Sequence, residues 1–207
     1  MQKSKSVLLV MGSIRAGRKC PQVTAWVEGL ARQACPETSF ETIDLALWNL
    51  PMDNEPGIPA LGRYTQAHTL AWSEKIRAAD AVAFITPQFN WGYPAALKNA
   101  IDHLYAEWRG KPTVIVTYGG HGGTRCARQL RRVAASLKMK VVPTTVQLEL
   151  PETVIRDGVP LEPEQAFQRF VPKVRQAFLE LADQLQGHEG LLAKGNRTWR
   201  AFMSSMS

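Results

Sequence analysis

Three short runs of mostly apolar residues constrain the fold of this chain more than any other feature of its sequence. They cover residues 7–11, 80–85 and 113–118. None of them alternates between apolar and polar residues, as a strand with one solvent-exposed face does. Such runs are typical of parallel strands that are buried on both faces. Each run is followed by a break and then by apolar residues at helical spacing. The chain is therefore expected to alternate between buried strands and amphipathic helices.

Five alternations of this kind can be followed along the sequence. Strands are predicted at residues 7–11, 39–45, 80–85, 113–118 and 140–148, and helices at about 21–34, 62–79, 95–108, 124–137 and 163–186. The pattern predicts an α/β fold with helices on both faces of a parallel sheet. A single domain of five strands suits the flavodoxin-like three-layer sandwich with strand order 2-1-3-4-5. Pro143 predicts an edge position or a bulge in the fifth strand.

Length and composition agree with one globular domain. The chain has 207 residues, and we expect one domain over residues 1–186 followed by a C-terminal tail, 187–207, in which helical periodicity ends. No apolar run approaches the roughly 20 residues that cross a bilayer, so no contact with a membrane is expected. The three cysteines, Cys20, Cys35 and Cys126, form neither a disulfide framework nor a metal-binding pattern. We expect a cytoplasmic protein without a metal site.

The formal net charge of +7 admits two kinds of partner. Nucleic acid is one, but the basic residues are scattered rather than gathered in a stripe, so no nucleic acid is expected. Anionic small ligands such as phosphates are the other, and the loops favour them.

The loop after the first predicted strand, residues 12–19, is suited to a phosphate. It contains Gly12, Ser13, Arg15 and Arg18 and leads into a helix, whose unpaired N–H groups and positive dipole end attract anions. Ser13 can donate a hydroxyl hydrogen bond and Arg15 a charged one. Ile14 stands where the dinucleotide fingerprint needs glycine, and no Gly-Lys-Ser/Thr P-loop is present. A solvated basic turn is the alternative. Cys20, near the start of the helix, is a thiolate candidate, although an unreactive thiol is the simpler interpretation.

The loop after the third predicted strand, residues 86–94, combines amides and aromatic side chains. Pro87, Gln88, Phe89 and Asn90 precede a helix that Pro94 is expected to begin. This loop predicts one wall of a ligand site, with an ordinary turn packed over its aromatics as the alternative.

The loop after the fourth predicted strand, residues 118–123, is rich in glycine. Tyr118 is followed by Gly119, Gly120, His121 and two further glycines, which permit close approach of a flat ligand to the backbone. In the order 2-1-3-4-5 the three unusual loops converge on one crevice. A phosphorylated planar ligand is expected there, and FMN fits.

These motifs, taken in order, resemble the NAD(P)H-dependent FMN reductase family, the flavodoxin-like quinone and azo-dye reductases. The resemblance covers about residues 5–150 and rests on residues 12–18, 87–102, 107–112 and 118–123. It implies that Ser13, Arg15 and the turn around Arg18 hold the FMN phosphate. It also implies that Pro87, Gln88, Phe89 and Asn90 line the isoalloxazine, and that Tyr118, Gly119 and Gly120 border its opposite side. Residues 97–102 and 107–108 resemble the family's helix at a dimer interface.

Two departures from the family pattern stand out. Gln88 and Phe89 replace the usual Glu-Tyr, which removes a carboxylate and a hydroxyl near the flavin. Lys19 and Cys20 replace the serine or asparagine that many members carry after the arginine.

The resemblance implies an FMN-dependent oxidoreductase. Hydride would pass from NADPH or NADH to bound FMN and on to a quinone, azo compound, flavin or similar small-molecule acceptor, with no side chain assigned a catalytic role. A homodimer or homotetramer is expected. Two alternatives stay open: a flavodoxin-like electron carrier, although such carriers are often acidic, and a non-catalytic flavin-binding sensor or scaffold.

Overall fold

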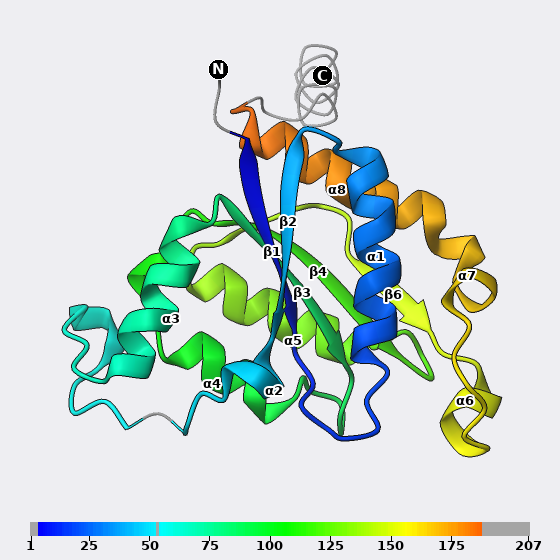
Figure 1. The fold of residues 1–207 in the computed structure, drawn as a ribbon, viewed down its shortest axis with the longest axis horizontal. Helices are drawn as coiled ribbons and strands as arrows, with labels where there is room; N and C mark the ends of the chain where they lie inside the picture. The colour runs from blue at the N-terminus through cyan, green and yellow to red at the C-terminus, as the bar shows by residue number, and fades with distance from the viewer. Residues whose placement is uncertain (1–3, 53, 188–207) are drawn as a thin grey trace, which may run out of the picture.

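A parallel sheet of order β2-β1-β3-β4-β5 forms the centre of the molecule, which confirms the predicted fold (Figure 1). A computed structural model describes residues 4–52 and 54–187. The strands are β1 (Lys5–Met11), β2 (Thr38–Asp44), β3 (Ala81–Pro87), β4 (Pro112–Gly119), β5 (Lys140–Val141) and β6 (Val146–Glu149). Every pairing between them is parallel. The predicted tail after residue 187 lies outside the described residues.

The fifth predicted strand is divided into two short strands that share one neighbour. β5 pairs with the start of β4 and β6 with its end. Pro143 lies between them and has no N–H for the ladder. The next residue, Thr144, donates its N–H to Glu180 Oε2 at 2.8 Å instead of to β4. Pro143 therefore marks an interruption of the predicted fifth strand, which is divided into β5 and β6 instead of forming one continuous edge strand.

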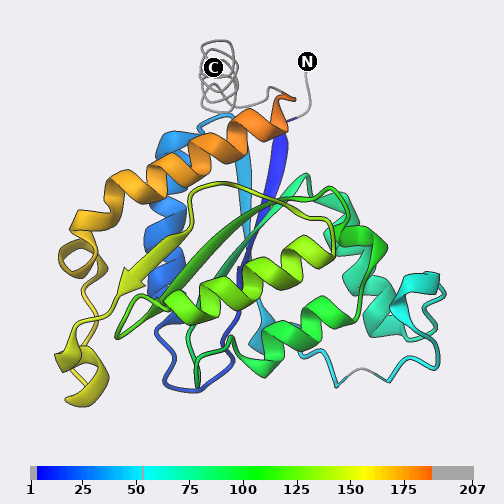
Figure 2. The same ribbon diagram turned by 180° about the vertical axis from the view of Figure 1, so that it is seen from behind.

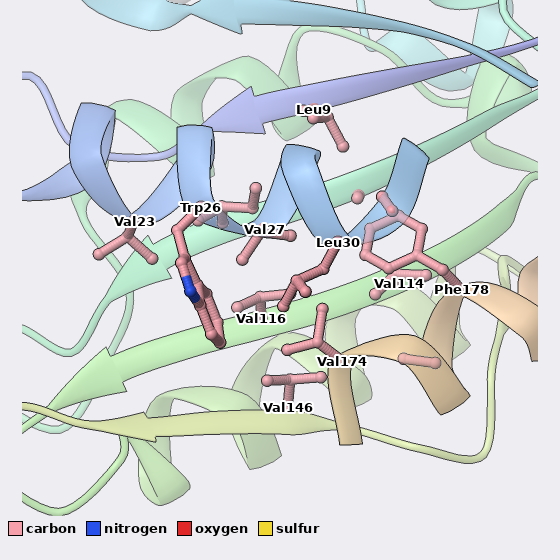
Figure 3. Close-up of a cluster of buried hydrophobic side chains, with 14 of the residues drawn as sticks. Leu9, Val23, Trp26, Val27, Leu30, Val114, Val116, Val146, Val174 and Phe178 are labelled. Carbon is pink, nitrogen blue, oxygen red and sulfur yellow. The ribbon is translucent and has the colours of Figure 1, made fainter. Parts of the chain in front are cut away.

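Helices cover both faces of the sheet (Figures 1 and 2). On one face α1 (Cys20–Ala34) packs with α8 (Val171–Leu185). On the other face lie α3 (Ala67–Ala78), α4 (Ala95–Asp102) and α5 (Thr124–Ser136). Successive residues of β1 face opposite ways, so Leu9 joins the core under α1 and α8 while Leu8 joins the core under the other helices. Figure 3 shows the first core, where Trp26, Leu30 and Phe178 meet valines of β4 and β6.

Three predicted helices are shorter than expected, and each has a local cause. α3 begins at Ala67 because Thr65 and Gln66 donate their N–H groups to the carboxylate of Glu55. α8 begins at Val171 because Pro172 is tolerated only in the first turn of a helix, where its missing N–H has no partner to bond. The preceding residues form α7 (Pro163–Ala166) and the 3-10 turn η3 (Gln168–Phe170).

The helix predicted to reach residue 108 ends as α4 at Asp102, and the 3-10 turn η2 (Ala106–Trp108) follows. The Ile101 carbonyl accepts the indole N–H of Trp108 at 2.9 Å, whereas in a continuing helix the N–H of residue 105 would bond to it. Pro94 precedes α4 rather than beginning it.

Three short elements were not predicted. They are α2 (Leu45–Trp48), the 3-10 turn η1 (Pro59–Leu61) and α6 (Glu152–Arg156). Each spans at most five residues, which is too short for a helical period to be visible in the sequence. Among the helices of residues 4–52 and 54–187, none is long and apolar enough to span a membrane.

Candidate functional site

The loops after β1, β3 and β4 meet at the carboxyl ends of these strands and line one cavity of about 290 Å³. The loops after β1 and β3 lie together at the lower edge of Figure 1. Nine of the ten predicted site residues line the cavity: Ser13, Arg15, Arg18, Pro87, Gln88, Phe89, Tyr118, Gly119 and Gly120. Asn90 does not; it is exposed at the tip of a turn. The predicted convergence at the switch point is therefore observed.

The first loop contains buried polar atoms that the described chain does not satisfy. Ser13 is only 1% exposed, and neither its Oγ nor Arg18 Nε has a hydrogen-bond partner among the described residues. Buried polar groups are normally paired, and leaving them unpaired is unfavourable. One hydroxyl and one guanidinium N–H, both beside the same cavity, are donors suited to an anionic ligand.

Arg18 is held in place by an acid from the neighbouring strand. Its Nη2 lies 2.5 Å from Oδ2 of Asp44, the last residue of β2. The other carboxylate oxygen accepts from Ala46 N at 3.0 Å and so caps α2. Asp44 thus joins the first loop to β2 through Nη2, while Arg18 Nε has no partner among the described residues.

Arg15 lies over the ring of Phe89, with its guanidinium carbon 3.8 Å from the ring centroid. This cation–π contact joins the first and third loops across the cavity. The Arg15 side chain is exposed, so a ligand can reach its N–H groups from the open side. Phe89 has no hydroxyl to compete with the guanidinium for hydrogen bonds.

Gln88 caps the amino end of α5. Its side-chain Oε1 accepts from the backbone N–H groups of Arg125 and Cys126, both at 3.1 Å. Its backbone N–H donates to the Tyr118 carbonyl at 2.9 Å. The neutral amide thus satisfies two of the N–H groups that a helix leaves unpaired at its start. This is the structural role of the residue that stands where the family usually has a glutamate.

A tight turn follows Gln88. Phe89 and Gly92 exchange backbone hydrogen bonds of 2.9 Å, and the two residues between them, Asn90 and Trp91, have φ values of 46° and 70°. Positive φ at both central positions is the geometry of a type I′ turn. We refer to residues 89–92 as the aromatic turn.

The glycine loop depends on close backbone packing. Gly123 has a φ of 73°, and a Cβ there would lie 2.8 Å from Cβ of Thr117. Thr117 Oγ1 also donates to the Gly122 carbonyl at 2.8 Å, which folds the loop back on β4. The loop therefore keeps the backbone of Gly119 and Gly120 at the cavity wall.

Tyr118 and Cys20 belong more to the core than to the site. Tyr118 is 3% exposed and lies in the core that contains Cys20. Burial raises the pKa of the Tyr118 hydroxyl well above its ordinary range. Burial also raises the pKa of the Cys20 thiol, so the unreactive interpretation of Cys20 fits the structure and the thiolate interpretation does not.

Part of the cavity wall was missed from the sequence. Leu150, Val154 and Ile155 also line it, and the last two belong to α6. The signal available was slight: an apolar Val-Ile pair inside an otherwise polar, proline-rich stretch. These side chains add an apolar surface beside the glycine loop, as a planar ring requires.

The sequence matches the family model described as NADPH-dependent FMN reductase over residues 6–151. This match includes all three loops of the cavity. The chain belongs to the NADPH-dependent FMN reductase family.

Curated members of related sequence support this membership. An NAD(P)H-dependent FMN reductase of Schizosaccharomyces pombe is 49% identical over 180 residues, which cover 85% of this chain and 88% of that protein. A quinone reductase of Escherichia coli K12 is 32% identical over 149 residues, which cover 69% of this chain and 76% of that protein.

Solved structures agree on the fold. A flavoenzyme NAD(P)H:(acceptor) oxidoreductase of Paracoccus denitrificans superposes with a TM-score of 0.65 at 22% identity, covering 89% of this chain and 98% of that one. An NAD(P)H:quinone oxidoreductase of Methanothermobacter marburgensis gives 0.60 at 21% identity, covering 86% and 100%. Both share the flavodoxin-like architecture.

As a member of this family the chain is an oxidoreductase with FMN as its cofactor and NAD(P)H as its electron donor. The cavity fits that cofactor. FMN joins a phosphate to a flat, largely apolar ring, and the cavity joins the unpaired donors Ser13 Oγ and Arg18 Nε to an apolar wall.

The helix that resembles the family's dimer interface has both exposed and buried side chains. Lys98 and Asp102 are exposed. Leu97, Ile101 and Trp108 are at most 2% exposed within the single chain, where they form the core under α4. The oligomeric state stays a prediction, and these three buried side chains cannot contact a second chain.

Proposed function

We propose that this chain binds FMN in the cavity at the carboxyl ends of β1, β3 and β4, and uses NAD(P)H to reduce quinones or related small acceptors. The single observation that carries the site assignment is the pair of buried, unpaired donors, Ser13 Oγ and Arg18 Nε, beside one cavity. A bound phosphate would supply acceptors for these two donor atoms, which have none among the described residues.

The chain's residues act by binding and orienting. Ser13, Arg15 and Arg18 supply hydrogen bonds and positive charge for the phosphate. Pro87, Gln88 and Phe89 form one side of the ring site, and Gly119 and Gly120 the other. Val154 and Ile155 exclude water from one edge. When bound, FMN supplies the chemistry, which is hydride acceptance from NAD(P)H and release of electrons to the acceptor. No side chain is required as a nucleophile.

The acceptor class is supported by the relatives. The Escherichia coli protein is named a quinone reductase and aligns with 69% of this chain, and an FMN reductase of Saccharomyces cerevisiae aligns with 65%. The open, partly apolar mouth of the cavity suits a flat acceptor that takes the place of the oxidised nicotinamide. The cytoplasmic location and the homo-oligomer stay predictions.

Turnover tests the proposal. The FMN-loaded protein is mixed with NADPH or NADH under anaerobic conditions, and the flavin absorbance near 450 nm, a general flavin property, is followed before and after addition of a quinone. The proposal predicts bleaching by the nucleotide and recovery with the quinone. A protein that binds FMN but is not bleached by either nucleotide would be a carrier, and the proposed enzyme function would be wrong.

A further inference from the structure

A second groove adjoins the flavin cavity on the other side of the aromatic turn. It has a volume of about 810 Å³ and is lined by Gln88, Trp91, His121, Thr124, Arg125, Arg128, Gln129 and Arg132. We refer to it as the α5 groove. Gln88 lines both the α5 groove and the flavin cavity, so a ligand that leaves the cavity across Gln88 enters the groove.

Positive charge dominates the α5 groove. Arg125, Arg128 and Arg132 follow one another at spacings of three and four residues, which places them on one face of α5. None of the described residues that line the groove is acidic. The groove therefore attracts anions.

The arginines of α5 divide into two kinds. Arg131 has a structural role, since its Nη1 donates to the Val142 carbonyl at 3.1 Å and to Thr145 Oγ1 at 2.7 Å. Arg128 and Arg132 are exposed and make no hydrogen bond or ion pair with the described part of the chain. Their donors are free for a ligand.

Trp91 adds an aromatic surface to this charge. Its φ of 70° is unusual for a bulky residue, because the left-handed region favours glycine and asparagine. The guanidinium carbon of Arg125 lies over its ring, 3.2 Å from the ring centroid, yet Trp91 remains 61% exposed. Strained conformations of this kind are concentrated at ligand sites. A stacked Trp–Arg pair offers a platform for a purine base.

The dimensions suit the adenosine half of a nicotinamide dinucleotide. Arg125 and Arg132 are seven residues apart, which corresponds to about 10 Å along the helix axis. A dinucleotide has a diphosphate at its middle and, in NADPH, a further phosphate on the adenosine ribose. With the nicotinamide end at the flavin cavity, the diphosphate would pass Gln88 and Arg125, and the ribose phosphate would reach Arg128 and Arg132.

We propose that the α5 groove binds the adenosine half of NADPH and that Arg128 and Arg132 hold its 2′-phosphate. The inference rests on the proposed function, since it places the electron donor of that reaction, and it makes the enzyme selective for NADPH over NADH. An arginine beside the ribose is the usual way in which proteins accommodate this phosphate.

Two other occupants of a basic groove are less well matched. A nucleic acid needs a basic stripe that continues well beyond one helix face. A second copy of the chain would need a complementary acidic surface. Direct continuity with the flavin cavity through Gln88 favours a small ligand that occupies both.

Calorimetry with adenosine 2′,5′-bisphosphate and AMP tests the inference directly on the FMN-loaded protein. The bisphosphate is expected to bind about tenfold more tightly than AMP, the scale of one additional charge-assisted contact. The Arg128→Ala/Arg132→Ala double variant is expected to lose that difference, and its kcat/KM for NADPH relative to NADH is expected to fall by about tenfold or more.

Arg109→Ala is the matched control, because it removes an exposed arginine that precedes β4 at the opposite edge of the sheet. It should keep both the bisphosphate preference and the NADPH preference. Equal affinity for the two adenosine nucleotides in the wild type, or a parallel loss for NADPH and NADH in the double variant, would overturn the inference. If the protein failed to bind FMN, the proposed function would fail, whereas the same bisphosphate and AMP titrations of the apoprotein would still test the groove.

Discussion

Two buried polar clusters lie at opposite edges of the sheet and differ in how completely their atoms are paired. The first, at the carboxyl ends, contains Ser13 and Arg18, each with an unpaired atom in the described chain. The second, at the amino ends of β3 and β4, surrounds the carboxylate of Glu107. That carboxylate accepts from Ser73 Oγ at 2.7 Å, from Arg77 Nη2 at 2.8 Å and from the Tyr64 hydroxyl at 3.0 Å.

The difference separates a structural site from a binding site. The Glu107 cluster satisfies its carboxylate from within the chain and ties α3 to η2, so its function is to hold the fold together. The Ser13 cluster has two donors without acceptors in the described chain, and we propose that a ligand supplies them. Both clusters contain a buried serine, and their different pairing predicts opposite responses to the same mutation.

Glu107→Ala is expected to have the largest effect. The Glu107 side chain is fully buried, and its loss leaves the hydroxyls of Ser73 and Tyr64 without an acceptor. We expect the free energy of unfolding to fall by roughly 3 kcal/mol, measured by denaturant titration of the apoprotein. The FMN affinity of the folded protein should stay the same. A loss below about 1 kcal/mol would contradict the structural role of this cluster.

Arg15→Ala tests the first loop, which also contains Ser13 and Arg18, through ligand binding. The Arg15 side chain is exposed and lies over the ring of Phe89, so the fold should tolerate its removal. FMN binding should weaken by roughly 1.5–3 kcal/mol, the value of a charge-assisted hydrogen bond. Fluorescence titration of FMN measures the change. Unchanged affinity would mean that the first loop does not hold the phosphate.

The matched variants Ser13→Ala and Ser73→Ala remove the same hydroxyl group from each of the two clusters. Ser73→Ala removes a made hydrogen bond and should lower the free energy of unfolding by about 1 kcal/mol. Ser13→Ala removes an unpaired buried hydroxyl, so it should leave the stability of the apoprotein equal or raise it by up to about 1 kcal/mol, while weakening FMN binding by a similar amount. If both variants were destabilised equally, the two clusters would not differ as described.

The Glu107 cluster should also impose a pH dependence. Burial raises the pKa of Glu107, but the hydrogen bonds from Ser73, the backbone and Tyr64 and the charge of Arg77 together outweigh burial and lower that pKa below the ordinary value of 4.5. A carboxylate with a depressed folded-state pKa contributes stability that is fully present above the unfolded-state value and is lost as the pH falls through the folded-state pKa. The stability difference between wild type and Glu107→Gln should therefore be constant near neutral pH and shrink below about pH 4.5. A difference that does not change with pH would contradict the assignment.

The sequence predicted the fold and the convergence of loops because both depend on patterns that short segments carry. Unalternating apolar runs identify buried parallel strands, and the alternation of strand and helix determines which loops share an edge. The boundaries were less predictable, since they depend on distant partners. α3 starts where it does because of Glu55, and α4 stops because the Trp108 indole takes the Ile101 carbonyl.

The sequence predicted which residues line the candidate site, but it did not predict which of them contact one another. Nothing in the spacing of the sequence indicates that Asp44 binds Arg18, that Arg15 stacks on Phe89, or that Gln88 caps α5. These contacts join residues that lie between 26 and 74 positions apart along the chain. The replacement of the family's usual glutamate by Gln88 is explained only by the structure, in which the neutral amide oxygen accepts two helix N–H groups.

Titration of the wild-type apoprotein with FMN shows whether the unpaired donors beside the cavity form a flavin phosphate site. We expect saturable quenching of FMN fluorescence at one FMN per chain, and competition by inorganic phosphate at the first loop. The absence of quenching, or quenching that Ser13→Ala and Arg15→Ala both leave unchanged, would contradict it.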